Sequence, residues 1–509
     1  MTHSGLSLAD AFVLLVYLAG TVLLGSRFAK GRTTSRSFYL AGQNLSWIPV
    51  GLSTVAALIS GNTYLGLPSE VRSHGLAFLI LPFSIILAIP IATNVFLPFF
   101  RRLQVISAYE YLEKRFDVRV RCLASALFVV WRLIWLAMVI YVPALAFSTV
   151  TGMSIVVTII LLGLLTTLYT AMGGIEAVIW TDVAQFFVMV GAALLTIWVV
   201  GTHITSGLPA IWQSAAEAGR TRLLNFSLDP TVRMTFWGAL VGGAFANLAY
   251  LGADQVIVQR YLTAKSGQDA RWSIVLSGIG TIVIVVPLAV LGLALYAFYH
   301  EHPQLLPSGI EEDKVFPYFI AHEFPNGVAG LLIAAIFAAT MSSLSSGINA
   351  VSAAIDIDFV QRFSIWQRKS GVNKDARQLR FARLLSTLIG ACATVLACFV
   401  GRLGTIVEIG LRFIDGFSGP LLGLFVLGMF SRRATPEAAF LGALLGIATT
   451  TAVNFASPFS FTWFPAIGCL TTLGSGYAIS WLGNPPPASS AQWVYCRGRD
   501  RVSGDSVFS

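Results

Sequence analysis

Four serines lie close together in one apolar stretch of the chain, between Ala339 and Asn349. They are Ser342, Ser343, Ser345 and Ser346. On a helix Ser342, Ser345 and Ser346 share one face, and Ala339, Ser342 and Ser343 share an overlapping one. Such hydroxyls can bond to carbonyls one turn earlier and ease helix packing. They can also bind a small cation if a second segment supplies more oxygens.

Two other apolar segments are interrupted by small and polar residues. Residues 51–68 contain Ser, Gly, Asn, Thr and Pro near their middle, and residues 238–260 contain Gly, Asn, Asp and Gln. This pattern is typical of a helix broken inside the membrane, with backbone carbonyls turned toward a site, although small residues also allow close packing or a simple kink. Five segments separate equivalent positions, so the pair predicts a transporter site between two repeats of opposite orientation.

Composition assigns the whole chain to the membrane. Of 509 residues, 56% are hydrophobic and 11% are charged, with a mean hydropathy of +0.76. A soluble domain has about 25% charged residues. We therefore predict an all-α polytopic membrane protein, in which the first apolar segment is a retained helix. About thirteen runs are long enough to span a bilayer. They begin near Asp10, Trp47, Leu76, Cys122, Ile155, Ile179, Phe236, Trp272, Gly327, Ala382, Gly404, Ala438 and Trp463.

The net charge of +9 comes mainly from alternate loops. Four basic residues lie between positions 27 and 36, six between 101 and 121, and seven between 362 and 383. The positive-inside rule then predicts an outside N-terminus and a cytoplasmic C-terminus in a cell membrane. The positive charge would face anionic lipid headgroups, which argues against a nucleic-acid partner.

Several stretches resemble the sodium/solute symporters over nearly the whole chain. They are residues 107–116 (SAYEYLEKRF), 169–185 (YTAMGGIEAVIWTDVAQ), 255–266, the serine stretch and 419–425 (GPLLGLF). The resemblance is nearest the branch that carries iodide, monocarboxylates, vitamins and sialic acid. It implies a LeuT-like core of two inverted five-helix repeats, residues 47–202 and 234–430. An extra helix at 9–29, two C-terminal helices within 437–483 and a tail at 484–509 complete the predicted organisation.

The resemblance implies sodium as the coupling ion. The general site would use backbone carbonyls of Ala56, Ile59 and Ala339 with the hydroxyls of Ser342 and Ser343, because sodium needs about five hard, mostly neutral oxygens. A second site, present in some members, would use Asp182 with Ser342, Ser345 and Ser346. The alternative for Asp182 is a position in the first turn of a helix that begins near Ile179.

For the solute, the family pattern points to seven residues: Ser60, Thr63, Phe78, Arg132, Asn247, Tyr250 and Arg412. Leu58 and Pro82 depart from polar positions of sugar-binding members. The carboxylate-binding arginine of sialic-acid carriers aligns with Trp135, one turn from Arg132. Arg132 has no acidic neighbour on its own helix, which favours an anionic solute as its partner. Arg412 has Glu408 and Asp415 within one turn, so an ion cluster within its helix is the alternative.

These features predict a secondary active transporter that couples the influx of sodium, with two ions favoured, to uptake of a small organic solute by alternating access. A carboxylate such as a monocarboxylate or sialic acid is preferred, and a monomer is the expected functional unit. The alternatives are a carrier of sugar or another neutral solute, and a solute sensor without transport. With six histidines, no metal-ligand spacing and no pairing of a nucleophile with a base, the sequence predicts no enzyme.

Overall fold

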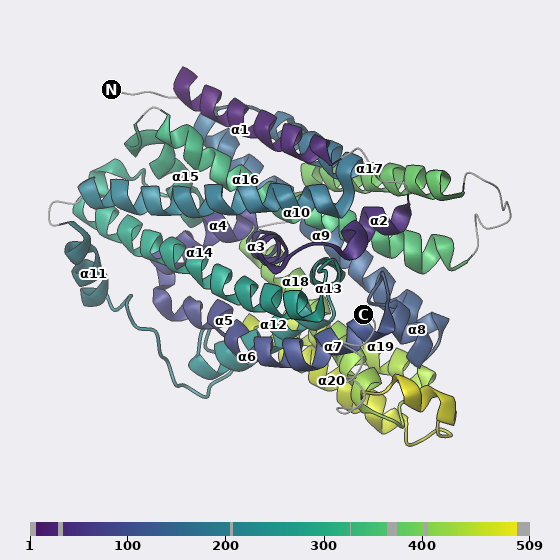
Figure 1. The fold of residues 1–509 in the computed structure, drawn as a ribbon. Helices are drawn as coiled ribbons and strands as arrows, with labels where there is room; N and C mark the ends of the chain where they lie inside the picture. The colour runs from purple at the N-terminus through teal and green to yellow at the C-terminus, as the bar shows by residue number, and fades with distance from the viewer. Residues whose placement is uncertain are drawn as a thin grey trace.

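The structure is a computed structural model that describes residues 7–28, 34–203, 207–325, 327–363, 374–401 and 406–495. Helices make up the fold, and the described residues contain no named strand (Figure 1). Eight helices in this part of the chain are long and apolar enough to cross a membrane, or ten if each of two bent pairs is one span. The all-helical membrane fold predicted from composition is confirmed.

The described residues form twenty α-helices. They are α1 (Leu8–Arg27), α2 (Ser35–Leu40), α3 (Trp47–Leu58), α4 (Gly61–His74), α5 (Ile80–Phe83), α6 (Ile85–Ile91), α7 (Leu97–Leu103), α8 (Glu110–Arg115), α9 (Val118–Thr151), α10 (Ile155–His203), α11 (Gly207–Glu217), α12 (Gly243–Gly252), α13 (Gln255–Leu262), α14 (Gly267–Glu301), α15 (Glu312–Glu323), α16 (Val328–Ala354), α17 (Lys374–Val400), α18 (Ile406–Phe430), α19 (Pro436–Ala456) and α20 (Phe464–Ile479). A π-helical segment, Gly238–Gly242, precedes α12, and another, Ile355–Gln361, follows α16.

Helices occupy all thirteen predicted apolar runs, but two of the runs form one element. The runs that begin near Ile155 and Ile179 both lie in α10, which contains a break at Gly174 with φ +62°. A Cβ at this position would lie 2.5 Å from the carbonyl oxygen of Phe38. Glycine is therefore required here both for the backbone conformation and for the close approach of the neighbouring segment.

Both predicted breaks are present. The axes of α3 and α4 differ by 61°, and those of the segments Gly238–Gly252 and Gln255–Leu262 differ by 52°. At the first break the Ser60 hydroxyl accepts a hydrogen bond from Thr63 N and so caps α4. At the second, Asp254 caps α13 by accepting a hydrogen bond from Val256 N at 2.8 Å. Side-chain caps satisfy the first N–H groups of each inner helix, and therefore stabilise the breaks.

Helix α1 lies at the edge of the bundle (Figure 1), whereas the serine helix α16 is almost entirely buried. In the most apolar 18-residue stretch of the span that contains α16, 89% is buried inside the protein, compared with 22% of the corresponding stretch of α1. Helix α1 packs on α10 and α16. Asp10 at its start accepts hydrogen bonds from the backbone N–H groups of Gly327 and Gly330, both at 2.7 Å. A carboxylate at these N–H groups stabilises the beginning of α16.

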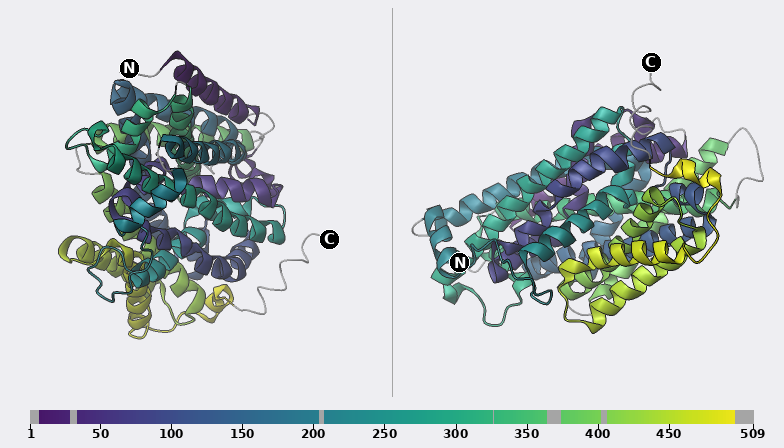
Figure 2. Two further views of the ribbon diagram at one scale, coloured as in Figure 1. Left: turned by 90° about the vertical axis from the view of Figure 1, so that its left-hand side faces the viewer. Right: turned by 90° about the horizontal axis from the view of Figure 1, so that it is seen from below.

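The C-terminal helices α19 and α20 pack against each other and against α18. Figure 2 shows this yellow-green group together at one side of the bundle. The two broken helices lie on the inside, and all eight residues of α13 are buried. The fold therefore surrounds the two breaks with other helices and leaves their polar groups facing the protein interior.

Candidate functional site

The serine helix faces the carbonyl groups released at the end of α3. The Ser342 hydroxyl lies 2.7 Å from the Ala56 carbonyl oxygen and 3.1 Å from that of Ala339. The Ser343 hydroxyl lies 3.2 Å from the Ala57 oxygen and 3.5 Å from the Ile59 oxygen. The structure thus brings together all five residues predicted for the first sodium site, and adds the carbonyl of Ala57.

This oxygen cluster follows from the local sequence. Helix α3 ends at Leu58 and Ile59 takes an extended conformation, so the last carbonyls of α3 have no partner one turn later. Both serines are buried, with 0% and 4% of their surface exposed. The cluster consists of neutral hard oxygens, which suit a monovalent alkali cation. The described residues contain no group of three or more His, Cys, Asp or Glu side chains able to bind a metal ion.

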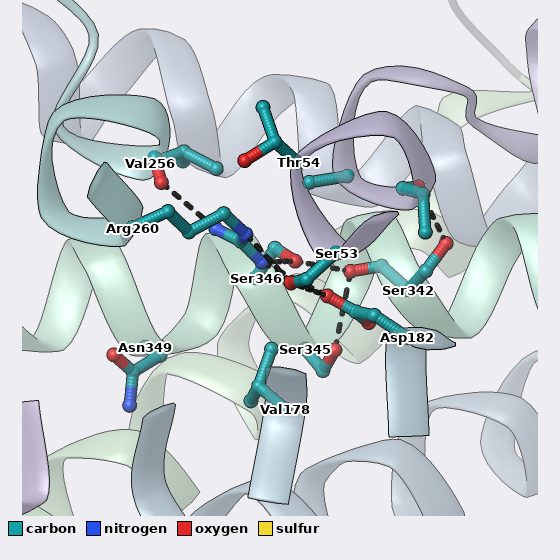
Figure 3. A network of polar contacts seen from close by, with 12 residues as sticks. Ser53, Thr54, Val178, Asp182, Val256, Arg260, Ser342, Ser345, Ser346 and Asn349 are labelled. Atoms are coloured by element: carbon teal, nitrogen blue, oxygen red, sulfur yellow. Dashed lines mark hydrogen bonds and ion pairs between the residues drawn. The ribbon is translucent and has the colours of Figure 1, made fainter. Parts of the chain in front are cut away.

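Asp182 belongs to a second polar cluster on the other side of the serine face (Figure 3). It is fully buried, and its Oδ2 accepts hydrogen bonds from the Ser53 hydroxyl at 2.6 Å and from Arg260 Nη2 at 3.1 Å. Arg260 also donates to the Ser346 hydroxyl and to the Val256 carbonyl oxygen. The guanidinium therefore lies between two of the residues predicted for the second sodium site.

The alternative role of Asp182 near the start of a helix is wrong. Helix α10 begins at Ile155, its internal break is at Gly174, and Asp182 lies two turns beyond that break. Its carboxylate contacts side chains of α3 and α13 and caps no helix. Arg260 was missed as a site residue, although it lies in the stretch 255–266 that carries the family resemblance. Spacing along one helix could not reveal a partner 78 positions away.

One oxygen of Asp182 is still available. Oδ1 is buried and has no hydrogen-bond partner within the part of the chain that the structure describes. Ser345 and Ser346 both donate to the carbonyl oxygen of Ser342. The Ser345 oxygen can therefore still accept or ligate, and the Ser346 oxygen keeps one lone pair beside the hydrogen bond that it accepts from Arg260. An unpartnered buried carboxylate oxygen beside hydroxyls suits a cation, but the positive charge of Arg260 competes for the same carboxylate.

A cavity of about 300 Å³ lies beside the breaks. Five of the residues predicted to bind solute line it: Thr63, Phe78, Arg132, Asn247 and Tyr250. Leu58, Pro82 and Trp135 line it as well, so apolar groups occupy the positions noted in the sequence. Ser60 does not line the cavity, because its side chain is fully buried in the cap of α4. Arg412 lies in α18, but its side chain is outside the described residues.

Arg132 has a partner that the sequence did not predict. Its guanidinium forms an ion pair with Asp254, the residue that caps α13, and lies over the ring of Trp131 at 4.7 Å from the ring centroid. The expectation that an anionic solute would be the partner of Arg132 did not foresee this carboxylate, which lies on another helix. The ion pair satisfies one guanidinium nitrogen, Nη2, whereas Nε is buried and has no partner among the described residues.

Comparisons with known proteins show the family to which the chain belongs. A sequence model of the sodium:solute symporter family matches residues 38–446. The sodium/sialic acid symporter SiaT of Proteus mirabilis is 33% identical over 471 residues, which cover 91% of this chain and 93% of that protein. The human sodium-coupled monocarboxylate transporter 1 is 34% identical, over 83% of this chain and 68% of that protein. A putative sodium-dependent multivitamin transporter of Drosophila melanogaster is 31% identical, over 93% and 86%.

Solved structures show the same fold. The substrate-bound outward-open state of a Na⁺-coupled sialic acid symporter superposes with a TM-score of 0.86 at 30% identity, covering 94% of this chain and 99% of that one. The nucleobase-cation symporter Mhp1, in a closed conformation, gives a TM-score of 0.58 at 12% identity, over 91% and 99%. The second likeness concerns the fold alone.

Proposed function

Because the chain belongs to the sodium:solute symporter family, with a LeuT-like fold and Na⁺ as its coupling ion, we propose that it couples sodium influx to uptake of a small carboxylate. It is a transporter and not an enzyme. Alternating access fits the fold, since both broken helices line the cavity together with the unbroken helices α9 and α14.

The first sodium ion would bind where α16 meets the end of α3. Its ligands would be the carbonyl oxygens of Ala56, Ile59 and Ala339 and the hydroxyls of Ser342 and Ser343. The observation that carries this assignment is the convergence of both serine hydroxyls on the freed carbonyls, at 2.7 to 3.5 Å. An ion there would join the first broken helix to the serine helix, and would thereby order the wall of the solute cavity beside it.

The solute would lie in the 300 Å³ cavity, with its negative group near Arg132. Thr63, Phe78, Asn247 and Tyr250 would complete its contacts, because they line the same cavity. Relatives named as sialic acid and monocarboxylate carriers support an organic anion as the solute. Ser60 would act indirectly, by fixing the break in the first helix.

A second sodium ion would bind at the free oxygen of Asp182, with Ser342, Ser345 and Ser346 as the other ligands. A second ion would matter for the driving force. Each sodium ion contributes about 2.3 kcal/mol from a membrane potential of about 100 mV, and about 1.4 kcal/mol from a tenfold gradient. With a monoanionic solute, one ion makes transport electroneutral and limits accumulation to about tenfold. With two ions, both concentration gradients contribute, but the membrane potential acts on only one net positive charge because the solute carries a negative one. The total is about 5 kcal/mol, enough for accumulation of several thousandfold.

The distribution of basic loops supports an orientation with the N-terminus outside and the C-terminus in the cytoplasm. The residues proposed to bind the first sodium ion and the residues that line the cavity all belong to one chain. This supports a monomer as the functional unit.

Transport by purified protein in liposomes tests the proposed function. Uptake of a labelled carboxylate should require an inward sodium gradient, and should collapse when potassium replaces sodium. Equal uptake in potassium would contradict sodium coupling. Sodium-dependent uptake of a neutral sugar with no uptake of any carboxylate would support the coupling but reject the anionic solute.

A further inference from the structure

A second cavity lies between α10 and α17, apart from the solute cavity. Its volume is about 360 Å³, and among the described residues none lines both cavities. Most of its α10 wall is apolar and its α17 wall is polar and charged. Leu164, Leu168, Ala171 and Met172 lie on the first wall, and Thr387 and Arg383 lie on the second. We call this cavity the α10–α17 groove.

Two glycines hold the helices in contact beside the groove. A Cβ at Gly163 of α10 would lie 2.0 Å from Thr394 Oγ1, and one at Gly390 of α17 would lie 2.0 Å from Thr167 Oγ1. No larger residue fits at either glycine unless the neighbouring helix moves. On α17, the residues that line the groove come one and two turns before Gly390. The groove therefore opens where the glycine contacts end, toward the beginning of α17.

The rim of the groove faces the lipid. Leu164 and Leu168 on α10 are 61% and 46% exposed, and Leu384 and Leu388 on α17 are 54% and 55% exposed. Both helices are long and apolar enough to cross a membrane, so exposed leucines on them contact hydrocarbon instead of water. An empty groove at this place would forfeit dispersion contacts along its walls, and a lipid acyl chain restores them.

Positive charge gathers at the end of the groove nearest the beginning of α17. The first ten residues of α17 contain four basic side chains and a single carboxylate, Asp375. Arg383 lines the groove itself and is partly buried. Helix α2, which carries the exposed Arg36, packs against both α10 and α17, and its Phe38 shares a buried cluster with Ala382. Arginine forms paired hydrogen bonds with phosphate, and basic residues at the end of a span attract anionic headgroups.

From these features we propose that the α10–α17 groove binds an anionic phospholipid from the leaflet on the side of the basic loops. Its phosphate accepts hydrogen bonds from the guanidinium of Arg383, and one acyl chain lies along Leu164, Leu168 and Ala171. The lipid joins α10 to α17 beyond the glycine contacts, and therefore stabilises the bundle where these helices separate. The groove contains no residue of the proposed sodium sites or of the solute cavity, so lipid binding should not require sodium.

Thermal unfolding of the purified full-length protein in detergent tests the lipid class. The probes are dioleoylphosphatidylglycerol, dioleoylphosphatidylcholine and inorganic phosphate, each titrated with and without sodium. In both media the anionic lipid should raise the unfolding midpoint in a saturable manner, with half-saturation at a concentration at least about fivefold lower than that of the zwitterionic lipid. Inorganic phosphate should have no such effect, because it has no acyl chain to fill the groove.

Three outcomes of these titrations would overturn the proposal. They are equal half-saturation by the two lipids, the same stabilisation by inorganic phosphate, and an effect of the anionic lipid that appears only in sodium.

Three variants locate the effect at the groove. Arg383→Gln should remove the preference for the anionic lipid, whereas Arg383→Lys should retain part of it, because the positive charge remains. Thr387→Trp fills the groove from an exposed position, and should weaken the binding of both lipids while the charge of Arg383 stays. Unchanged lipid titrations in Arg383→Gln and Thr387→Trp would place the lipid elsewhere and contradict the proposal.

Arg380→Gln is the matched control. Arg380 is an exposed arginine one turn before Arg383 on the same helix, and it does not line the groove. Its loss should leave most of the preference for the anionic lipid. Equal losses in Arg380→Gln and Arg383→Gln would show a general attraction by the charged end of α17, and would reject the groove as the site. If Arg383→Gln does not fold, Thr387→Trp and the titrations of the native protein still decide.

Discussion

The guanidinium of Arg260 pairs with the carboxylate of Asp182, 3.1 Å apart, with both side chains fully buried. The pair joins α13 to α10, and Arg260 also reaches Ser346 on the serine helix. A cation at the free oxygen of Asp182 would therefore share this carboxylate with a fixed positive charge. Sodium binding at the proposed second site would consequently depend on the same residue that attaches α13 to α10.

The first prediction concerns the second ion. Asp182→Asn leaves the buried Arg260 without its counter-charge, so it should lower the unfolding midpoint, at a cost of about 3–5 kcal/mol. The double variant Asp182→Asn with Arg260→Gln has no unpaired charge and should recover much of this stability. When the folded double variant is reconstituted in liposomes, the charge moved per solute molecule should be one less than for the native protein. A reversal potential identical to that of the native protein would remove the second site.

The second prediction concerns the first ion. Ser342→Ala removes a hydroxyl that lies 2.7 Å from the Ala56 oxygen, so the sodium concentration for half-maximal thermal stabilisation should rise about tenfold, equivalent to about 1.4 kcal/mol. Ser352→Ala is a matched control, because Ser352 is a buried serine of α16 that bonds only within its own helix through its side chain. An unchanged sodium requirement in Ser342→Ala would mean that the serine serves helix packing.

The third prediction concerns the fit between the break and the serine helix. A Cβ at Gly61 would lie 2.4 Å from both Pro143 Cγ and Thr340 Oγ1. Gly61→Ala should therefore push α4 away from α16, destabilise the protein by about 1–3 kcal/mol and weaken sodium binding. Gly66→Ala, on the same helix but with no atom within 4 Å of the new Cβ, should be neutral or stabilising. Thermal unfolding of both variants is measured with and without sodium. Equal unfolding midpoints for Gly61→Ala and Gly66→Ala would show that the neighbours of Gly61 move aside at no cost in stability.

The fourth prediction concerns pH and lies outside the spanning segments. Partial burial alone would raise the pKa of Glu113, but the guanidinium groups of Arg121 and Arg362, at 2.7 and 2.6 Å, outweigh it and hold this pKa below its usual value of 4.5. Ionised Glu113 thus contributes stability that is fully present above 4.5 and is lost as the pH falls through the lower folded-state value.

Glu113→Gln should accordingly be less stable than the native protein near neutral pH, and its unfolding midpoint should change less on acidification. Glu437→Gln, which removes a carboxylate that is 63% exposed, controls for the loss of one negative charge. Parallel acid profiles for the native protein and Glu113→Gln would contradict the assignment.

The sequence predicts those features that local spacing encodes. The serine face follows from helical periodicity, and both breaks follow from small and polar residues inside apolar runs. The ligands of the proposed first sodium site, by contrast, were implied by the family resemblance. The ion pairs could not be predicted. Arg132 and Asp254 are 122 positions apart, and Arg260 and Asp182 are 78 apart, so only the packed fold brings each pair together.

Ser60 shows a different limit. A serine beside a break can face a ligand or cap the next helix, and both roles place it at the same position in the sequence. The choice depends on the direction of its side chain, which the structure shows to be the cap. The repeat boundaries and the orientation in the membrane stay predictions from the sequence.

The attachment of Asp10 to Gly327 and Gly330 has a mechanical consequence. A Cβ at Gly330 would lie 2.5 Å from the backbone of Asp10, so the beginnings of α1 and α16 touch with no room for sliding. Rotation of the serine helix about its own axis is therefore restrained at one end by a helix outside the predicted ten-helix core. A rotation of the serine helix must therefore either carry the start of α1 with it or break the two hydrogen bonds to Asp10.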